Sequence, residues 1–211
     1  MENKCVILLL SGGIDSTTLL AKLSSDGFNV IAVSFDYEQK HRIELRYAKE
    51  NARKYNVKTH EIIKLDKNIF ASSALVNNGI DVAGYKKGEL PLGIVNTYVP
   101  YRNLIFISNA LSIAETRGIK DIYLAFNSDD QNNYWDCSME FLQTINAISG
   151  PMNKIQVKAP FIQKSKSEVI QLAKELQVNL NETITCYQPQ ESQECGQCLS
   201  CLSKQQALEN D

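Results

Sequence analysis

Apolar residues in this chain form short continuous runs that alternate with segments of helical spacing. The runs predict buried strands at residues 5–10 and 30–35, because a parallel strand covered on both faces is apolar throughout. Residues 59–65 are a third strand candidate, and residues 121–126 are another. Helical spacing predicts helices at residues 17–23, 41–55, 139–148 and 167–176, and residues 104–114, apolar nearly all round, predict a buried helix. This alternation is typical of an α/β fold with a doubly wound, mostly parallel sheet.

Ligands of such sheets lie beyond the carboxyl ends of the strands. The polar residues that follow the predicted strands are therefore the candidates for a site. They fall in three segments, residues 11–17, 36–42 and 127–137.

The first of these segments carries the clearest chemistry. Residues 11–18 read Ser-Gly-Gly-Ile-Asp-Ser-Thr-Thr. Glycines between a strand and a helix allow backbone N–H groups to face an anion, and the helix dipole favours negative charge. The hydroxyls of Ser11, Ser16 and Thr17 add donors, so we expect a phosphate site. The alternative is an ordinary serine-glycine turn that caps a helix.

The spacing separates this loop from two other phosphate loops. No lysine follows the glycines as in a Walker sequence, and the three glycines of a dinucleotide fingerprint are absent. The pattern Ser-Gly-Gly-x-Asp-Ser resembles the loop of the ATP-pyrophosphatase superfamily, whose members cleave ATP between its α- and β-phosphates and pass AMP to an oxygen of the substrate. The resemblance implies an ATP site formed by Leu10, Ser11, Gly12, Gly13, Ile14, Asp15, Ser16, Thr17, Thr18 and Phe35.

Composition and net charge limit the classes of binding partner that we expect. The chain has 211 residues and a formal net charge of −2, which is enough for one domain with a small appendage and gives no nucleic-acid or basic membrane surface. No apolar run approaches the roughly 20 residues that span a bilayer, and the segments of a signal peptide are not found in order. We therefore expect a cytoplasmic protein without nucleic-acid or membrane partners.

The alternation fades between Asp66 and Arg102, where several glycines and prolines interrupt it. A loop of this length in a compact domain is usually functional or mobile. We interpret residues 66–102 as a lid over nucleotide and substrate, within a nucleotide-binding domain of residues 1–180. A disordered surface insert is the alternative.

Four cysteines near the end of the chain have the spacing of a metal site. Cys195, Cys198 and Cys201 form a CxxCxxC motif, and Cys186 lies upstream of it. Four thiolates suit a tetrahedral structural zinc ion; disulfides are disfavoured in a cytoplasmic chain, and an iron–sulfur cluster is the remaining alternative. We expect Zn²⁺ to fold residues 181–211 into a small helical module.

The loop and the cysteine cluster together resemble one family, the 7-cyano-7-deazaguanine synthases of the queuosine pathway. The resemblance covers nearly the whole chain and is carried by Ser11–Thr18, Phe35–Tyr37, Gln39, His41–Arg42, Asn96–Thr97, Val99–Pro100, Arg102–Asn103, Tyr134, Asp136–Cys137, Pro160, Lys166, Glu168, Asn181–Thr183, Thr185–Tyr187 and the cysteine motif. It implies an adenine nucleotide alpha-hydrolase-like (HUP-type) fold and a ligase that uses ATP, Mg²⁺ and Zn²⁺, commonly as a homodimer.

The resemblance also implies the reaction. Such enzymes adenylate the carboxylate of 7-carboxy-7-deazaguanine and form the amide with ammonia. They then adenylate the amide oxygen and expel AMP to leave a nitrile. Catalysis of this kind rests mainly on positioning and on stabilising charge at the phosphates.

Three residues are the expected catalytic set. Asp15 is either a Mg²⁺ ligand, direct or through water, or a partner of the helix dipole. Arg102 and Lys166 are expected to contact phosphate or the substrate carboxylate, with a structural cation as the alternative.

The substrate is expected to contact Tyr37, His41, Arg102, Asn127, Tyr134 and Asp136. The Asp136 carboxylate would accept the paired N–H groups of a guanine-like ring. Tyr37, Tyr134 and Trp135 would stack on flat bases, although aromatic residues are more often part of a core. His41 is either a proton shuttle or a structural histidine.

Six positions depart from the family pattern. That pattern has glycine in place of Glu38, Tyr101 and Ala125, proline in place of Trp135, and arginine in place of Lys40 and Ser138. Because these positions fall in loops assigned to the acceptor side, two other functions stay open. One is a paralogue that joins the acyl adenylate to another amine, such as a protein terminus in a defence system. The other is a non-catalytic nucleotide-binding protein.

Overall fold

The computed structural model describes residues 4–88, 91 and 93–209, and the side chains of these residues except 150–153. Its sheet has five parallel strands in the order β3-β2-β1-β4-β5. The strands are β1 (Cys5–Leu9), β2 (Asn29–Asp36), β3 (Thr59–Lys64), β4 (Asp121–Tyr123) and β5 (Gln156–Lys158). Val6, Ile7 and Leu8 of the central strand are fully buried, which confirms the parallel sheet expected from the apolar runs.

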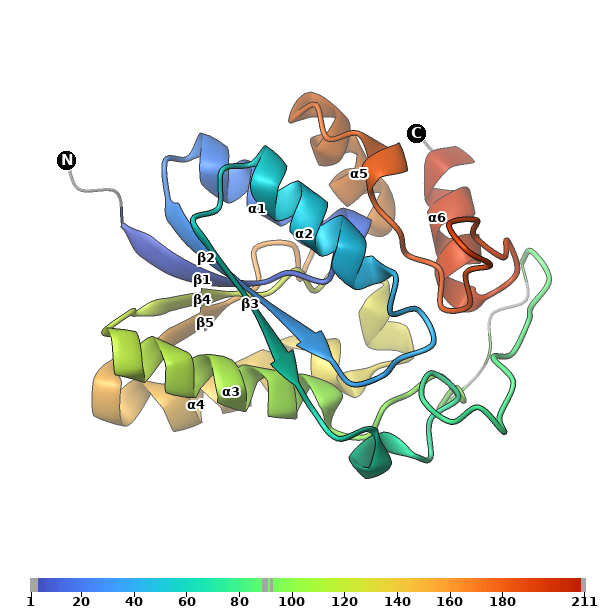
Figure 1. Cartoon of the computed structure of the whole chain (residues 1–211), viewed down its shortest axis with the longest axis horizontal. Coiled ribbons are helices and arrows are strands. Elements are labelled where there is room, and N and C mark those ends of the chain that lie inside the picture. Colours follow the sequence, from blue (N-terminus) through green and yellow to red (C-terminus); the bar gives the residue numbers. More distant parts are fainter. Residues whose placement is uncertain (1–3, 89–90, 92, 210–211) are drawn as a thin grey trace.

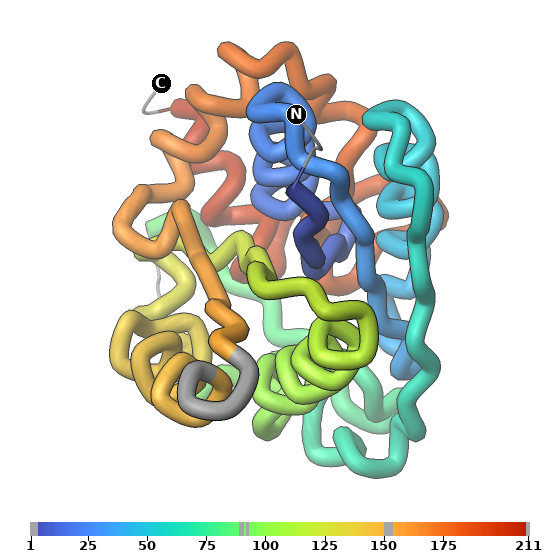
Figure 2. Tube along the Cα trace, turned by 90° about the vertical axis from the view of Figure 1, so that its left-hand side faces the viewer, coloured from blue at the N-terminus to red at the C-terminus, as the bar shows by residue number. Residues whose placement is uncertain are grey.

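Helices cover both faces of the sheet. They are α1 (Ile14–Ser25), α2 (Glu44–Lys54), α3 (Arg102–Arg117), α4 (Met139–Asn153), α5 (Lys166–Glu175) and α6 (Leu199–Glu209). Helices α3 and α4 lie on one side and the other four lie on the opposite side (Figures 1 and 2). Short 3₁₀ helices are η1 (Lys67–Phe70), η2 (Asp130–Asn132), η3 (Trp135–Cys137) and η4 (Leu180–Glu182). Among the described residues no helix is both long and apolar enough to cross a bilayer.

Some elements differ from the expectation. The sequence did not predict β5, because its three residues bury only Val157 between two polar neighbours. Strand β4 ends at Tyr123, short of residue 126. Helix α3 is not buried all round: Ile107, Ala110 and Ala114 are buried, whereas its other apolar residues are partly exposed because only one face packs against the sheet.

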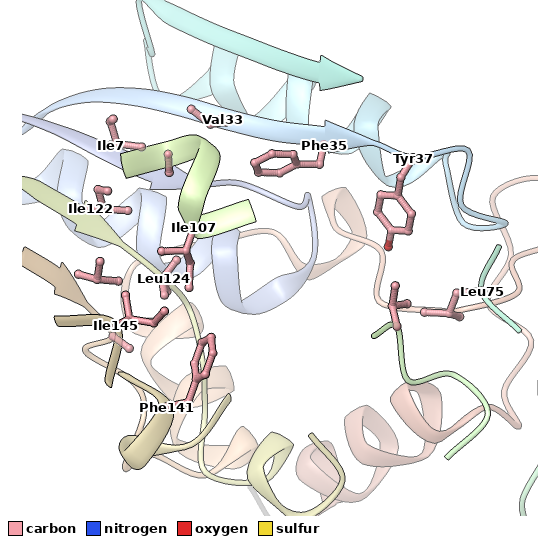
Figure 3. Close-up of a cluster of buried hydrophobic side chains, with 14 of the residues drawn as sticks. Ile7, Val33, Phe35, Tyr37, Leu75, Ile107, Ile122, Leu124, Phe141 and Ile145 are labelled. Carbon is pink, nitrogen blue, oxygen red and sulfur yellow. The ribbon is translucent and has the colours of Figure 1, made fainter. Parts of the chain in front are cut away.

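The main core lies between the sheet and helices α3 and α4 (Figure 3). Ile7 and Ile122 from the strands meet Ile107 and Ile145 from the two helices. Burial of each such side chain contributes about 1.5–3 kcal/mol of transfer free energy. This packed layer holds the strands in place, and with them the strand ends where a site is expected.

The described residues between 66 and 102, which are 66–88, 91 and 93–102, form little regular structure and lie along one edge of the molecule (Figure 1). They pack into the core through Phe70, Ala74, Leu75, Val76, Val95 and Val99. The backbone N–H of Tyr85 donates to the Gln197 carbonyl at 2.9 Å, and Lys87 pairs with Glu209 at 2.6 Å. The segment is therefore joined both to the core and to the cysteine-bearing end of the chain.

Candidate active site

A cavity of about 940 Å³ lies beyond the carboxyl ends of the strands. Residues that follow β1, β2 and β4 line it, together with the first turns of α3 and α5, the segment around Tyr187 and one face of α6. This is where ligands of doubly wound sheets bind. The volume is in the upper range for ligand pockets and is large enough for more than one small molecule.

The glycine-containing loop after β1 is held tightly against α2. A Cβ atom on Gly12, whose φ is +91°, would lie 2.3 Å from the carbonyl oxygen of Glu44. The Ser16 hydroxyl accepts hydrogen bonds from the backbone N–H groups of Ser11 at 3.2 Å and Gly12 at 3.3 Å. Glycine is therefore required at position 12 for both its backbone angle and its close approach.

The expected ATP residues divide into two sets. Leu10, Ser11, Gly13, Asp15, Ser16 and Phe35 line the cavity. Gly12, Ile14, Thr17 and Thr18 do not line it; the last three are buried in α1 behind the loop. The Thr18 hydroxyl, for example, donates to the Ile14 carbonyl at 2.7 Å, which is a helix contact.

Asp15 and Lys166 form an ion pair at the wall of the cavity. Lys166 Nζ lies 2.5 Å from Asp15 Oδ2, and the Lys166 backbone N–H donates to Asp129 Oδ2 at 3.1 Å. Lys166 opens α5, whose N-terminus is fixed by a capping box between Ser165 and Glu168. Burial lowers the pKa of Lys166, but Asp15, Asp130 and Asp129 together raise it, so the side chain is a cation.

Asp130 brings a second carboxylate to the same wall, where it lines the cavity. Burial, and next the charge of Asp15, raise its pKa to about 6. Asp15 Oδ1 is buried and has no hydrogen-bond partner among the described residues. Hard oxygen ligands of this kind fit Mg²⁺, so the donor set agrees with the expected metal.

Aromatic side chains contact Arg102, which also lines the cavity. Arg102 Nη1 donates to the Tyr37 hydroxyl at 3.4 Å, and its guanidinium carbon lies 5.9 Å from the centre of the Phe106 ring. Phe106 stacks on Phe35 with ring centres 3.9 Å apart and planes 3° apart. Burial raises the pKa of Tyr37 to about 12, so its hydroxyl is neutral.

Two expected substrate residues do not reach the cavity wall. The Asn127 side-chain oxygen accepts from the backbone N–H groups of Asp129 and Asp130 at 3.0 and 3.2 Å, and so shapes the loop after β4. Asp136 is buried in η3, and its carbonyl accepts from the Asn103 side chain at 3.3 Å. Neither residue is part of the cavity lining, whereas Tyr37, His41, Arg102 and Tyr134 are.

Sequence reasoning missed Glu44, which lines the cavity beside His41. His41 Nε2 lies 3.5 Å from Glu44 Oε1. Tyr187 and Phe106 were missed as well. Sequence position could have indicated two of these residues as members of the site. Glu44 begins α2 beside the segment that follows β2, and Tyr187 follows a cysteine of the metal motif.

The four cysteines of the C-terminal motif converge. The sulfur atoms of Cys186, Cys195, Cys198 and Cys201 all lie within 4.8 Å of one another. Cys186 Sγ accepts hydrogen bonds from the backbone N–H groups of Gln188 at 3.3 Å and Cys195 at 3.2 Å. Such bonds suit thiolates, and none of the described cysteines forms a disulfide. The cluster fits a metal ion such as zinc.

Comparison with known proteins identifies the family. The family model "Queuosine biosynthesis protein QueC" matches residues 4–211. A curated relative from Rickettsia felis, named 7-cyano-7-deazaguanine synthase, is 40% identical over 99% of this chain and 96% of its own length.

Solved structures agree on the fold. An NMN synthetase from Francisella tularensis is 18% identical, with a TM-score of 0.55 over 92% of this chain and 71% of that one. An NH3-dependent NAD synthetase from Campylobacter jejuni is 21% identical, with a TM-score of 0.50 over 86% of this chain and 68% of that one. The HUP-type fold is thereby confirmed. The chain is an enzyme of the QueC family of queuosine biosynthesis proteins.

Proposed function

We propose that this chain is an ATP-dependent ligase that converts 7-carboxy-7-deazaguanine and ammonia into 7-cyano-7-deazaguanine. The observation that carries the proposal is the shared cavity: the phosphate loop with Asp15 and Lys166 lies at one wall, and Arg102 with its aromatic neighbours lies at another. A triphosphate and a flat anionic heterocycle fit these two surfaces by charge and by shape.

The residues divide the work as follows. The backbone of the loop and Lys166 hold phosphate oxygens, and Arg102 orients the substrate carboxylate toward the α-phosphorus. Asp15 and Asp130 would hold Mg²⁺, which when bound neutralises charge on the phosphates. The four cysteines would hold Zn²⁺ as a structural ion, outside the chemistry. We also expect a homodimer, as the family resemblance implies.

The six departures from the family pattern bear on the alternative acceptor. Of these positions only Ala125 is part of the cavity lining. Tyr101 and Trp135 are exposed and form an edge-on aromatic pair with ring centres 6.3 Å apart. Because the other five positions lie outside the cavity lining, they give no sign of a site altered for another amine acceptor.

The test is a pyrophosphate-release assay with purified protein, MgATP and 7-carboxy-7-deazaguanine, with and without ammonium, read by mass spectrometry. The matched control replaces the substrate with 7-deazaguanine, which has no carboxylate to adenylate. A nitrile product supports the proposal. Pyrophosphate release without amide or nitrile favours a different amine, and no release with any carboxylate overturns the ligase assignment.

A further inference from the structure

His41 lines the active-site cavity and has a buried ring nitrogen without a hydrogen-bond partner among the described residues. This nitrogen is Nδ1, and the side chain is 6% exposed. An unpaired buried polar atom costs about 1–3 kcal/mol. Native structures retain few such atoms, and those they retain call for an explanation such as a catalytic role.

The neighbours of His41 determine which nitrogen carries the proton. The Gln39 amide nitrogen donates to the Phe35 carbonyl at 3.1 Å and to Glu44 Oε1 at 2.8 Å, while its oxygen accepts from the Tyr37 backbone at 3.0 Å. Since both ends of Gln39 are occupied, Glu44 Oε1 acts as an acceptor. An acceptor 3.5 Å from His41 Nε2 favours the tautomer with the hydrogen on Nε2. In that tautomer the lone pair is on Nδ1.

The pair lies beside the phosphate loop, because the Glu44 backbone is the surface on which Gly12 packs. Other titratable groups face it from three elements. Arg102 comes from α3, Tyr37 from the end of β2, and Tyr187, whose ring centre is 6.0 Å from that of His41, from the segment after η4. Among these groups Arg102 brings one fixed positive charge to the pair.

The surroundings shift the pKa values of His41 and Glu44 in opposite directions. Burial, assisted by the Arg102 charge, lowers the pKa of His41 to about 3. Burial raises the pKa of Glu44 to about 7, against the opposing effects of Gln39 and Arg102. A proton that reaches His41 is therefore passed on, and Glu44 can both accept and release it near neutral pH.

The proposed reaction needs such a device. When ammonia attacks the acyl adenylate, a C–N bond forms, the C–O bond to AMP breaks with its electrons leaving on AMP, and the nitrogen must lose a proton. We propose that His41 and Glu44 form a proton relay for this step: Nδ1 of His41 takes the proton from the attacking nitrogen, and Nε2 gives its own proton to Glu44. Glu44 then releases it to solvent. This role rests on the proposed function.

The experiment compares Glu44→Gln with Glu50→Gln, an exposed glutamate of the same helix. Adenylate formation is trapped with hydroxylamine, a strong nucleophile, and amide formation is followed with ammonium at a constant concentration of free ammonia across pH. Wild type and Glu50→Gln should form amide at a rate that rises with pH through about 7, where Glu44 ionises. Glu44→Gln should keep adenylate formation within about threefold and lose about 100-fold in amide formation, together with the rise.

Two results would overturn the relay. One is unchanged amide formation and pH profile in Glu44→Gln. The other is an equal loss of adenylate and amide, which would place the pair in the ATP step. If wild type forms no adenylate from this carboxylate, the proposed function fails instead, and the role in amide formation fails with it.

Nitrogen NMR of the free protein tests the tautomer without substrate. The chain has two histidines, so His60→Gln identifies the His41 signals. A bare Nδ1 whose shift changes as Glu44 titrates near 7 supports the relay. A proton on Nδ1 at neutral pH contradicts it.

Discussion

Lys166 Nζ lies 2.5 Å from Asp15 Oδ2, and this contact joins the start of α5 to the start of α1 across the cavity wall. The pair is separated by 151 positions in the sequence. We expect Lys166→Met to lower kcat/KM for adenylation by about 10²–10³, because a charge that would meet phosphate is lost. The rate of pyrophosphate release measures this loss in kcat/KM. Lys174→Met, an exposed change in the same helix, is the control, and equal activity of the two variants would contradict the assignment.

Gly12 and Gly13 should respond differently to alanine. A Cβ on Gly12 would lie 2.3 Å from the Glu44 carbonyl at a positive φ, whereas a Cβ on Gly13 would meet its nearest neighbours at 3.4 Å. We expect Gly12→Ala to lower the free energy of unfolding by about 2–4 kcal/mol and Gly13→Ala by less than about 1 kcal/mol. Urea denaturation gives both values, and similar losses would refute the close packing of the loop on α2.

Glu38 stands at a position where the backbone favours glycine. Its φ is 56°, and its carboxylate pairs with Lys67 at 2.8 Å on the surface. Both Glu38→Gly and Glu38→Ala remove this exposed ion pair, but only glycine relieves the left-handed backbone. The glycine variant should therefore be more stable than the alanine variant by about 1 kcal/mol. Thermal unfolding of the two proteins side by side is sufficient, and equal midpoints would argue against strain at this position.

Metal removal should loosen the segment 81–88. This segment is tied to the cysteine module through the hydrogen bond from Tyr85 to Gln197 and the ion pair between Lys87 and Glu209. Chelation should speed hydrogen exchange of the Tyr85 amide by at least about tenfold, because local opening then costs less free energy. Amides of α3 around Ile107 serve as the internal reference. Unchanged exchange at Tyr85 would mean that the module keeps its shape without metal.

Strands β1 and β2 were predictable as apolar runs that are buried along most of their length, and β3, a partly buried edge strand, and β4 were predictable as further strands. Strand β5 was not, since Gln156 and Lys158 flank its single buried residue. Helix α6 was expected only as part of a helical module, because its apolar positions give almost no helical pattern and two of its buried residues, Leu199 and Cys201, belong to the cysteine module.

For the site, local sequence patterns predicted a phosphate loop and a four-cysteine cluster, and the four sulfur atoms do converge. The importance of Glu44 could not be predicted in this way. It depends on the Gln39 side chain, which donates to Glu44 Oε1, and on burial that arises only in the folded chain. The placements of Asn127 and Asp136 away from the cavity likewise follow from loop packing that no spacing reveals.

Residues from both ends of the sequence line the cavity. Ser11 and Ser16 follow the first strand, and Ser203 and Gln206 belong to α6. A ribosome that has made the sheet has therefore not yet made the site. Until residue 206 emerges, the phosphate loop faces open water on that side. The complete cavity, and any reaction that takes place in it, therefore requires α6 to be in place.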